Sequence, residues 1–205
     1  MPEKTNKLIL YYTLLYYREI SMATNRELES LLKKYVDYED VDNDKLKQLL
    51  KSTRADIRAG LLMRVKSEHG STAVYSSFLR NELELLKCML DDLSIDQKYK
   101  LVSMQMSVFR ETPVHWPSMQ GDTDVVKYLL SGLTEHQIYN IIKIQDYKGN
   151  TPLHYAATNK HTDVVQYLLT SVSNEHRVEL LTIYNNKKET VRDIGEFIYL
   201  LVFLY

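Results

Sequence analysis

Residues 149–173 read GNTPLHYAATNKHTDVVQYLLTSVS, and weaker copies of this stretch recur before and after it. Each copy is anchored by a threonine, and the anchors lie 40, 39 and 39 residues apart: Thr72, Thr112, Thr151 and Thr190. Apolar pairs equivalent to the VV and LL of this stretch follow the first three threonines at fixed offsets. A fixed period of this kind indicates stacked supersecondary units, none of which buries its apolar face alone.

Each strong copy predicts two antiparallel helices. In the third copy, Thr151 caps the first helix and Pro152 takes its first position, where a missing N–H costs nothing. Thr162 or Asp163 is the expected cap of the second helix, whose apolar residues recur at helical spacing.

An insert follows every second helix and predicts a third, short helix in each unit. The inserts start at four possible capping residues: Thr53, Ser94, Thr134 and Ser173. The first three resemble capping boxes, in which a side chain three positions later bonds back to the cap: Thr53-x-x-Asp56, Ser94-x-x-Gln97 and Thr134-x-x-Gln137.

The TPLHYAA and VVQYLL motifs resemble the ankyrin repeat, whose signature T-P-L-H-x-A recurs about every 33 residues. The period here is longer by about six residues, which matches the extra helix. The resemblance covers roughly residues 53–191 and is strongest over 146–173. It implies an all-α fold, an ankyrin-type helical solenoid of stacked helix-turn-helix repeats with an extra short helix per repeat.

The second copy departs from this pattern after its histidine. It continues Trp116-Pro117-Ser118 where the third copy has Tyr155-Ala156-Ala157. A proline inside a helix removes a hydrogen bond and crowds the preceding turn. We therefore expect the first helix of the second repeat to be kinked or shortened.

Three regions are predicted along the chain. Residues 1–52 form N-terminal helices and a diverged capping repeat, with a capping box at Thr24-x-x-Glu27. Residues 53–190 form the ankyrin-repeat solenoid. Residues 191–205 form an incomplete or capping C-terminal repeat.

Composition narrows the class of function. The 205 residues carry 26 Lys and Arg against 27 Asp and Glu, a net charge of −1, which lacks the basic footprint of a nucleic-acid binder. The one cysteine, Cys88, excludes an intrachain disulfide framework, and with the absence of glycosylation sequons this favours a cytoplasmic protein. Residues 8–17 are faintly signal-like but are rich in tyrosine, with no clear cleavage site after them.

Several residues could suggest chemistry, but each has a structural explanation. His115 and His154 fill the histidine position of the motif, where the ring bonds to nearby backbone, and His161 follows the turn between helices. The spacing of histidines and Cys88 does not match a zinc site. Cys88 has no adjacent activating base, and P-loop, nucleophile-elbow and dinucleotide motifs are absent. We therefore predict no catalytic residue, no cofactor and no metal.

The predicted function is a non-enzymatic protein–protein interaction module, a monomeric scaffold for a protein partner. The resemblance implies binding on the concave side, built from the loops before each threonine and the exposed faces of the first helices. The candidates by position are Phe109, Trp116, Met119, Tyr147, Lys148, Tyr155 and Asn159. Trp116, Tyr147 and Tyr155 could equally be binding contacts or packing residues. We expect Trp116, Tyr155 and Phe109 to form one exposed patch.

Two alternatives remain open at this point. Residues 197–205 (FIYLLVFLY) end the chain on nine apolar residues, too few to span a bilayer, which takes about 20. They nonetheless fit the cytosolic ankyrin portion of a longer membrane-associated channel or receptor. An enzyme with an unrecognised site is the other alternative, and a pocket with strongly perturbed titrating groups would favour it.

Overall fold

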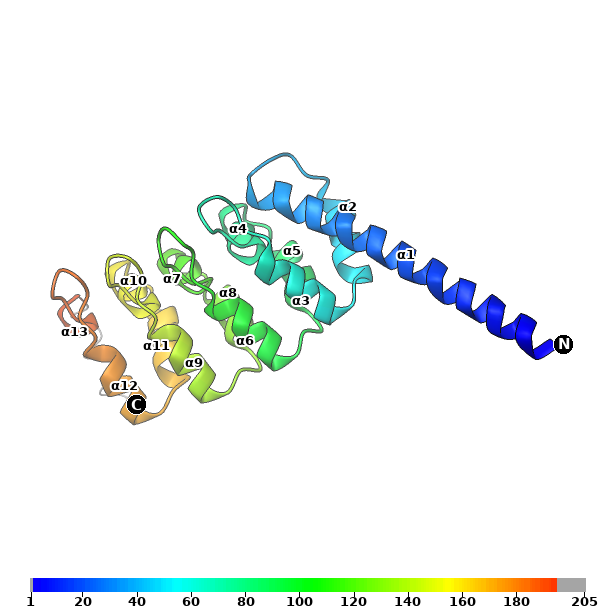
Figure 1. Cartoon of the computed structure of the whole chain (residues 1–205). Helices are drawn as coiled ribbons and strands as arrows, with labels where there is room; N and C mark the ends of the chain where they lie inside the picture. The colour runs from blue at the N-terminus through cyan, green and yellow to red at the C-terminus, as the bar shows by residue number, and fades with distance from the viewer. Residues whose placement is uncertain (1, 195–205) are drawn as a thin grey trace.

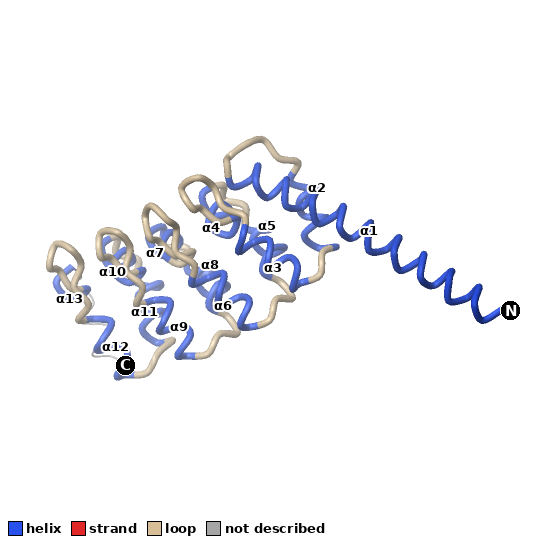
Figure 2. Tube along the Cα trace, in the orientation of Figure 1, coloured by secondary structure: helices blue, strands red, loops and turns tan. Residues whose placement is uncertain are grey.

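The structure, a computed structural model, describes residues 2–194, with side chains from residue 13 onward. The described residues form thirteen α-helices and no strand. Short helices stack side by side along one axis, and the loops between successive units follow one edge of the stack (Figures 1 and 2). The predicted all-α repeat stack is confirmed.

Three kinds of helix recur along the stack. The first helices of the repeats are α4 (Ala73–Leu79), α7 (His115–Gln120), α10 (Pro152–Thr158) and α13 (Val191–Ile194). The second helices are α2 (Asn43–Ser52), α5 (Leu83–Leu90), α8 (Thr123–Leu130) and α11 (Thr162–Thr170). The predicted third helices are α3 (Ala55–Arg64), α6 (Ile95–Ser103), α9 (Glu135–Ile142) and α12 (Asn174–Leu181).

The leading helix, α1 (Pro2–Val36), precedes the repeats. Its C-terminal part packs on α2 and α4, where Leu28, Leu32 and Tyr35 are fully buried. Its N-terminal part extends beyond the stack (Figure 1). The capping box predicted at Thr24 is wrong, because the helix runs through this residue and the Thr24 hydroxyl donates to the Ile20 carbonyl at 3.0 Å.

The apolar pairs of the repeats form one continuous core. In α11, all four members of the predicted pairs are buried: Val164, Val165, Leu168 and Leu169. Leu129 and Leu130 of α8 occupy the equivalent positions and are buried as well. Because each pair meets the neighbouring repeat, burial depends on stacking and not on any one unit.

Some of the predicted N-terminal helix caps are confirmed and others are wrong. Ser94, Thr134 and Thr151 each take part in a complete capping box. The Thr53 box is wrong, since α3 begins after Arg54 without a side-chain cap. The cap of α11 is His161 rather than Thr162 or Asp163, again with no side-chain bond, because the tight turn before it already fixes the helix start.

The predicted shortening of the first helix in the second repeat is confirmed. α7 starts at His115 and spans six residues, whereas α10 starts at Pro152 and spans seven. The later start places Pro117 in the first turn, where backbone N–H groups have no intrahelical partner. Because α7 begins at His115, Pro117 breaks no hydrogen bond within the helix.

Cations on the third helices cap the second helices. The buried Arg58 of α3 donates to the carbonyl of Leu50 at 2.8 Å and also to the carbonyl of Asp91, after α5. Lys98 of α6 donates to the carbonyls of Tyr128 and Ser131, at the end of α8, at 2.7 and 2.9 Å. A positive charge at a helix C-terminus satisfies free carbonyls and complements the helix dipole. The third helix therefore has a structural task in these repeats.

No helix within residues 2–194 has the length and apolar character required to cross a membrane. The apolar segment 197–205, and with it most of the predicted C-terminal repeat 191–205, lies outside the described residues. The first residues of that region form α13, where Val191 is buried.

Candidate partner-binding surface

Four hairpin loops, which we call fingers, precede the first helices. The first to fourth fingers are residues 66–71, 106–111, 145–150 and 184–189, and they lie along one edge of the stack (Figure 2). Each is closed by a backbone bond across its base, such as Asp146 N–H to Asn150 O at 2.9 Å. The fingers therefore present similar hairpins in register.

Each finger has one residue with left-handed backbone, two positions before the threonine. Gly70 and Gly149 hold this position in the first and third fingers with φ of 74° and 76°. Only glycine fits at Gly149, because an added Cβ would lie 2.8 Å from the Asn186 backbone nitrogen. Arg110 and Lys188 hold the same position in the second and fourth fingers, with φ of 55° and 63°.

Hydrogen bonds join the second, third and fourth fingers. Tyr147 N–H donates to Phe109 O, and one repeat later Asn186 N–H donates to Lys148 O, each at 2.9 Å. Gln145 spans the next junction with its amide, which donates to the carbonyls of its own finger and of the fourth. These bonds hold the three finger tips in one array.

An exposed pair of aromatic rings lies on this array. Phe109 and Tyr147 stand on adjacent fingers, are 43% and 45% exposed, and have ring centroids 5.7 Å apart. Lys148 lies with its amine 5.1 Å from the Tyr147 ring centre. Rings held at the surface by a fixed backbone supply contact area with little further loss of conformational freedom.

The carboxylates of the second, third and fourth fingers turn inward, whereas Glu68 of the first finger is exposed. Glu111 accepts a hydrogen bond from the hydroxyl of Tyr75, and burial raises its pKa. Asp146 is 2% exposed and accepts two backbone bonds within its finger and one from the hydroxyl of Tyr155 at 2.6 Å. Glu189 accepts from an asparagine amide of its own finger. The cations of these three fingers, in contrast, are exposed at the tips: Arg110, Lys148, Lys187 and Lys188.

Below the fingers, a threonine–histidine pair fixes the start of each strong repeat. His115 Nδ1 accepts from the Thr112 backbone N–H at 2.9 Å, so the ring proton sits on Nε2, which faces the Asn150 carbonyl at 3.3 Å. Full burial lowers the pKa of His115 to about 4. Thr151 and His154 form the same pair, and burial lowers the pKa of His154 as well. The predicted structural role of both rings is confirmed.

Two predicted contact residues are less exposed than expected. Trp116 and Tyr155 are both half-buried, so the predicted exposed patch of Trp116, Tyr155 and Phe109 is wrong. The Tyr155 ring packs edge-on against His115, with centroids 6.2 Å apart, while its hydroxyl bonds to Asp146. The ring and the hydroxyl of Tyr155 therefore both make contacts within the protein.

The other two candidates lie at the far ends of the first helices. Met119 is half-buried near the end of α7, and its carbonyl accepts from His161 Nε2 at 2.9 Å. Asn159 is exposed at the end of α10 and bonds to the Tyr155 carbonyl. Of the seven candidates, the structure brings only Phe109, Tyr147 and Lys148 together at the finger tips.

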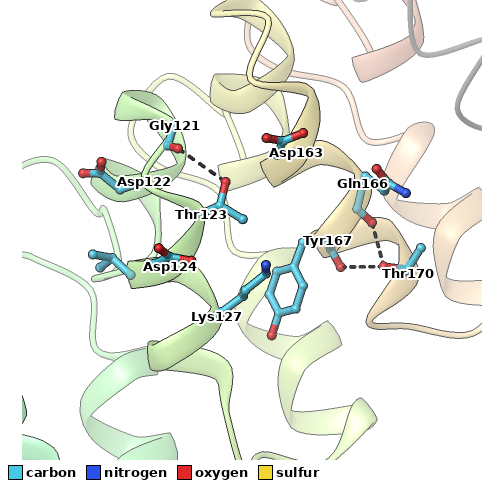
Figure 3. Close-up of a pocket in the computed structure, with 10 residues that line it drawn as sticks. Gly121, Asp122, Thr123, Asp124, Lys127, Asp163, Gln166, Tyr167 and Thr170 are labelled. Carbon is cyan, nitrogen blue, oxygen red and sulfur yellow. Dashed lines mark hydrogen bonds between the residues drawn. The ribbon is translucent and has the colours of Figure 1, made fainter.

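A groove of about 690 Å³ lies elsewhere, between α8 and α11 (Figure 3). It carries three aspartates, Asp122, Asp124 and Asp163, and the amine of Lys127 stands 5.9 Å from the Tyr167 ring centre. The groove begins near the turns that follow α7 and α10, at the opposite end of these helices from the fingers. Sequence analysis missed it, because it depends on how two second helices stack.

No set of three or more His, Cys, Asp or Glu side chains within the described residues is arranged to hold a metal ion. Cys88 is buried on α5. His161, the third histidine considered, bonds to a carbonyl of the preceding repeat.

Sequence analysis also missed Arg110, Lys187 and Lys188. A signal existed for two of them, since Arg110 and Lys188 replace the glycine found two positions before Thr72 and Thr151. None of the three forms an ion pair with a carboxylate of the described residues, and this depends on the three-dimensional arrangement.

A protein-family model described as Ankyrin repeats (3 copies) matches residues 80–180. No curated protein matches the chain.

Proposed function

Because residues 80–180 are ankyrin repeats, which generally act as protein–protein interaction modules, we propose that this chain is a non-enzymatic module that binds a partner protein through its finger tips. The Phe109–Tyr147 ring pair is the observation that carries the proposal. Two large exposed rings in contact on neighbouring fingers form a contiguous aromatic patch, and such patches mark protein–protein interaction sites.

The ring pair is also built to stay in place. The backbone bond from Tyr147 to Phe109 fixes the two fingers relative to each other. A partner that packs on the rings therefore orders little additional structure, which leaves more of the contact energy for affinity. Aromatic side chains of this kind are over-represented among the residues that dominate binding energy.

The test is a comparative affinity purification with mass spectrometry on the full chain. The bait variant Phe109→Ala/Tyr147→Ala removes both rings. The matched control, Ile95→Ala/Val178→Ala, removes two exposed apolar side chains from α6 and α12. We expect at least one protein to be retained by the wild type and the control but lost by the ring variant.

The outcome that contradicts the proposal is equally specific. If the ring variant retains every protein that the wild type and the control retain, the finger tips are not the binding surface. Circular dichroism and the urea midpoint of the ring variant should match those of the wild type, because both rings lie outside the core.

A further inference from the structure

The three joined fingers differ from the rest of the surface in how their charges are sorted. Their carboxylates accept hydrogen bonds from within the chain, as described above for Glu111, Asp146 and Glu189. Their cations are exposed at the tips, and none forms an ion pair with a carboxylate of the described residues: Arg110, Lys148, Lys187 and Lys188. A partner approaching the tips therefore meets positive charge and aromatic rings first.

A second observation singles out two of these cations. Arg110 and Lys188 stand where the other fingers have glycine, in left-handed backbone that side chains with a Cβ adopt at a cost. Glycine would relieve that cost at both positions. Lys160 shares this backbone and is exposed as well, but only Arg110 and Lys188 combine it with a place on the joined fingers, which makes their side chains candidates for function.

We propose that the tips of the second, third and fourth fingers bind an extended acidic segment of a partner protein, with Arg110 and Lys188 as its outer cationic contacts. This inference rests on the proposed function and specifies its partner. Tyr147 stands on the third finger, between the fingers that carry the two cations, and its ring contacts that of Phe109, so the segment carries apolar residues between its acidic ones.

The length of the segment follows from the stacking. Neighbouring packed helices lie about 8–10 Å apart, so three fingers span roughly 20 Å. An extended chain advances about 3.3 Å per residue, so roughly six to eight residues cover the array. Nucleic acid is the less favoured ligand, because the chain, with a net charge of −1, lacks the excess of basic residues that is typical of a nucleic-acid binder.

The experiment measures fluorescence anisotropy of a labelled peptide of about ten residues, long enough to cover this span. The probe alternates glutamates with leucines, and matched probes carry serine or lysine in place of glutamate. We expect the full chain to bind the glutamate probe more tightly than the other two. Affinity for that probe should fall as salt concentration rises.

The decisive variant is Arg110→Gly/Lys188→Gly. Its affinity for the glutamate probe should be about fivefold lower than that of the wild type, which is the loss expected when two exposed charge pairs are removed. At the same time its urea midpoint should rise above that of the wild type, because backbone strain is relieved. A variant that loses affinity while gaining stability cannot be explained by damage to the fold.

Lys160→Gly is the matched control. Lys160 is exposed and has a φ of 61°, but it lies at the C-terminal end of α10, away from the fingers. This variant removes one charge and relieves the same kind of strain. It should raise the urea midpoint and leave the affinity for the glutamate probe unchanged.

Five outcomes would overturn the inference. They are absence of binding to the glutamate probe, equal binding of the serine probe, unchanged affinity in Arg110→Gly/Lys188→Gly, equal loss of affinity in Lys160→Gly, and tighter binding of a single-stranded oligonucleotide than of the peptide. None of them touches the proposed function, which fails only if Phe109→Ala/Tyr147→Ala retains all partners. If a partner is lost by Phe109→Ala/Tyr147→Ala but retained by Arg110→Gly/Lys188→Gly, the finger tips are the binding surface but the partner does not bind through an acidic segment.

Discussion

The second and third repeats share a threonine–histidine pair but not the helix that follows it. Thr112 with His115 and Thr151 with His154 make equivalent contacts, with hydroxyl-to-ring distances of 2.9 and 2.8 Å. The first helices nonetheless differ in where they start and in length. The comparison teaches that the buried pair, and not the helix, sets the register of each repeat.

The same comparison extends to the first and last units. Tyr75 holds the histidine position of the first repeat, and its hydroxyl reaches Glu111 of the second finger. Asp193 holds it after the fourth finger, where its carboxylate accepts from the backbone N–H of Thr190 at 2.8 Å. Each substitute keeps one half of the histidine's bonding, either forward to the next finger or back to the threonine.

The largest effect is expected in the core that both repeats share. Leu168→Ala and Leu129→Ala remove equivalent and fully buried side chains, so each should lower the free energy of unfolding by about 2–5 kcal/mol. Urea denaturation of the full chain measures both. A loss below about 0.5 kcal/mol for Leu168→Ala is typical of a surface site and would show that the register is misassigned.

An intermediate effect is expected from pH, because it acts on the shared pair itself. The folded state holds His115 neutral with a pKa of about 4, so the unfolded chain binds more protons below its ordinary pKa of about 6.5. Stability therefore rises with pH in this window, and about 2 kcal/mol should be lost between pH 7 and pH 5. His154, whose pKa is also lowered, adds to the loss.

Urea midpoints measured between pH 7 and pH 5 report this loss of stability. Most carboxylates titrate below this range and therefore contribute little to it. His136→Ala, at an exposed position of α9, is the control and should keep the same pH dependence as the wild type. An unchanged midpoint across the window would mean that the two rings do not stay neutral and buried.

The smallest effect is expected where the two repeats differ. Ser118 of α7 is fully buried, and its hydroxyl has no hydrogen-bond partner among the described residues. An alanine, Ala157, holds the equivalent position of α10. Ser118→Ala should therefore raise the free energy of unfolding by about 1 kcal/mol, since a buried unpaired hydroxyl is removed. The converse change, Ala157→Ser, should lower it by a similar amount, and a destabilised Ser118→Ala would reveal a bond to the hydroxyl.

Local patterns in the sequence predicted the repeat well. Thr151, Pro152 and the apolar pairs of α11 act within a few residues of one another, so their roles could be read from spacing. Pro117 was equally local, and its effect on α7 was predicted. The cap at Thr24 failed because the packing of α1 on the first repeat, and not a cap signal, decides where that helix continues.

The candidate site was only partly predictable. Phe109, Tyr147 and Lys148 follow from their place in the fingers, and their exposure agrees with that reading. The half-burial of Tyr155 does not, because it depends on a hydroxyl that reaches Asp146 in the finger. The separation of exposed cations from hydrogen-bonded carboxylates at the tips could not be predicted either. It depends on which carboxylates accept hydrogen bonds in the folded chain.

Two of the caps made by the third helices point forward along the chain, whereas Arg58 also reaches back to Leu50 of α2 and Arg177 reaches back to Leu169 of α11. Arg58 reaches the end of α5 and Lys98 reaches the end of α8, so each of these repeats supplies a cation to the one that follows it. Protein synthesis runs the same way, and domains fold as they emerge. At these two junctions a newly made second helix meets a cation that is already in place. Growth of the stack from its N-terminal end is therefore assisted there.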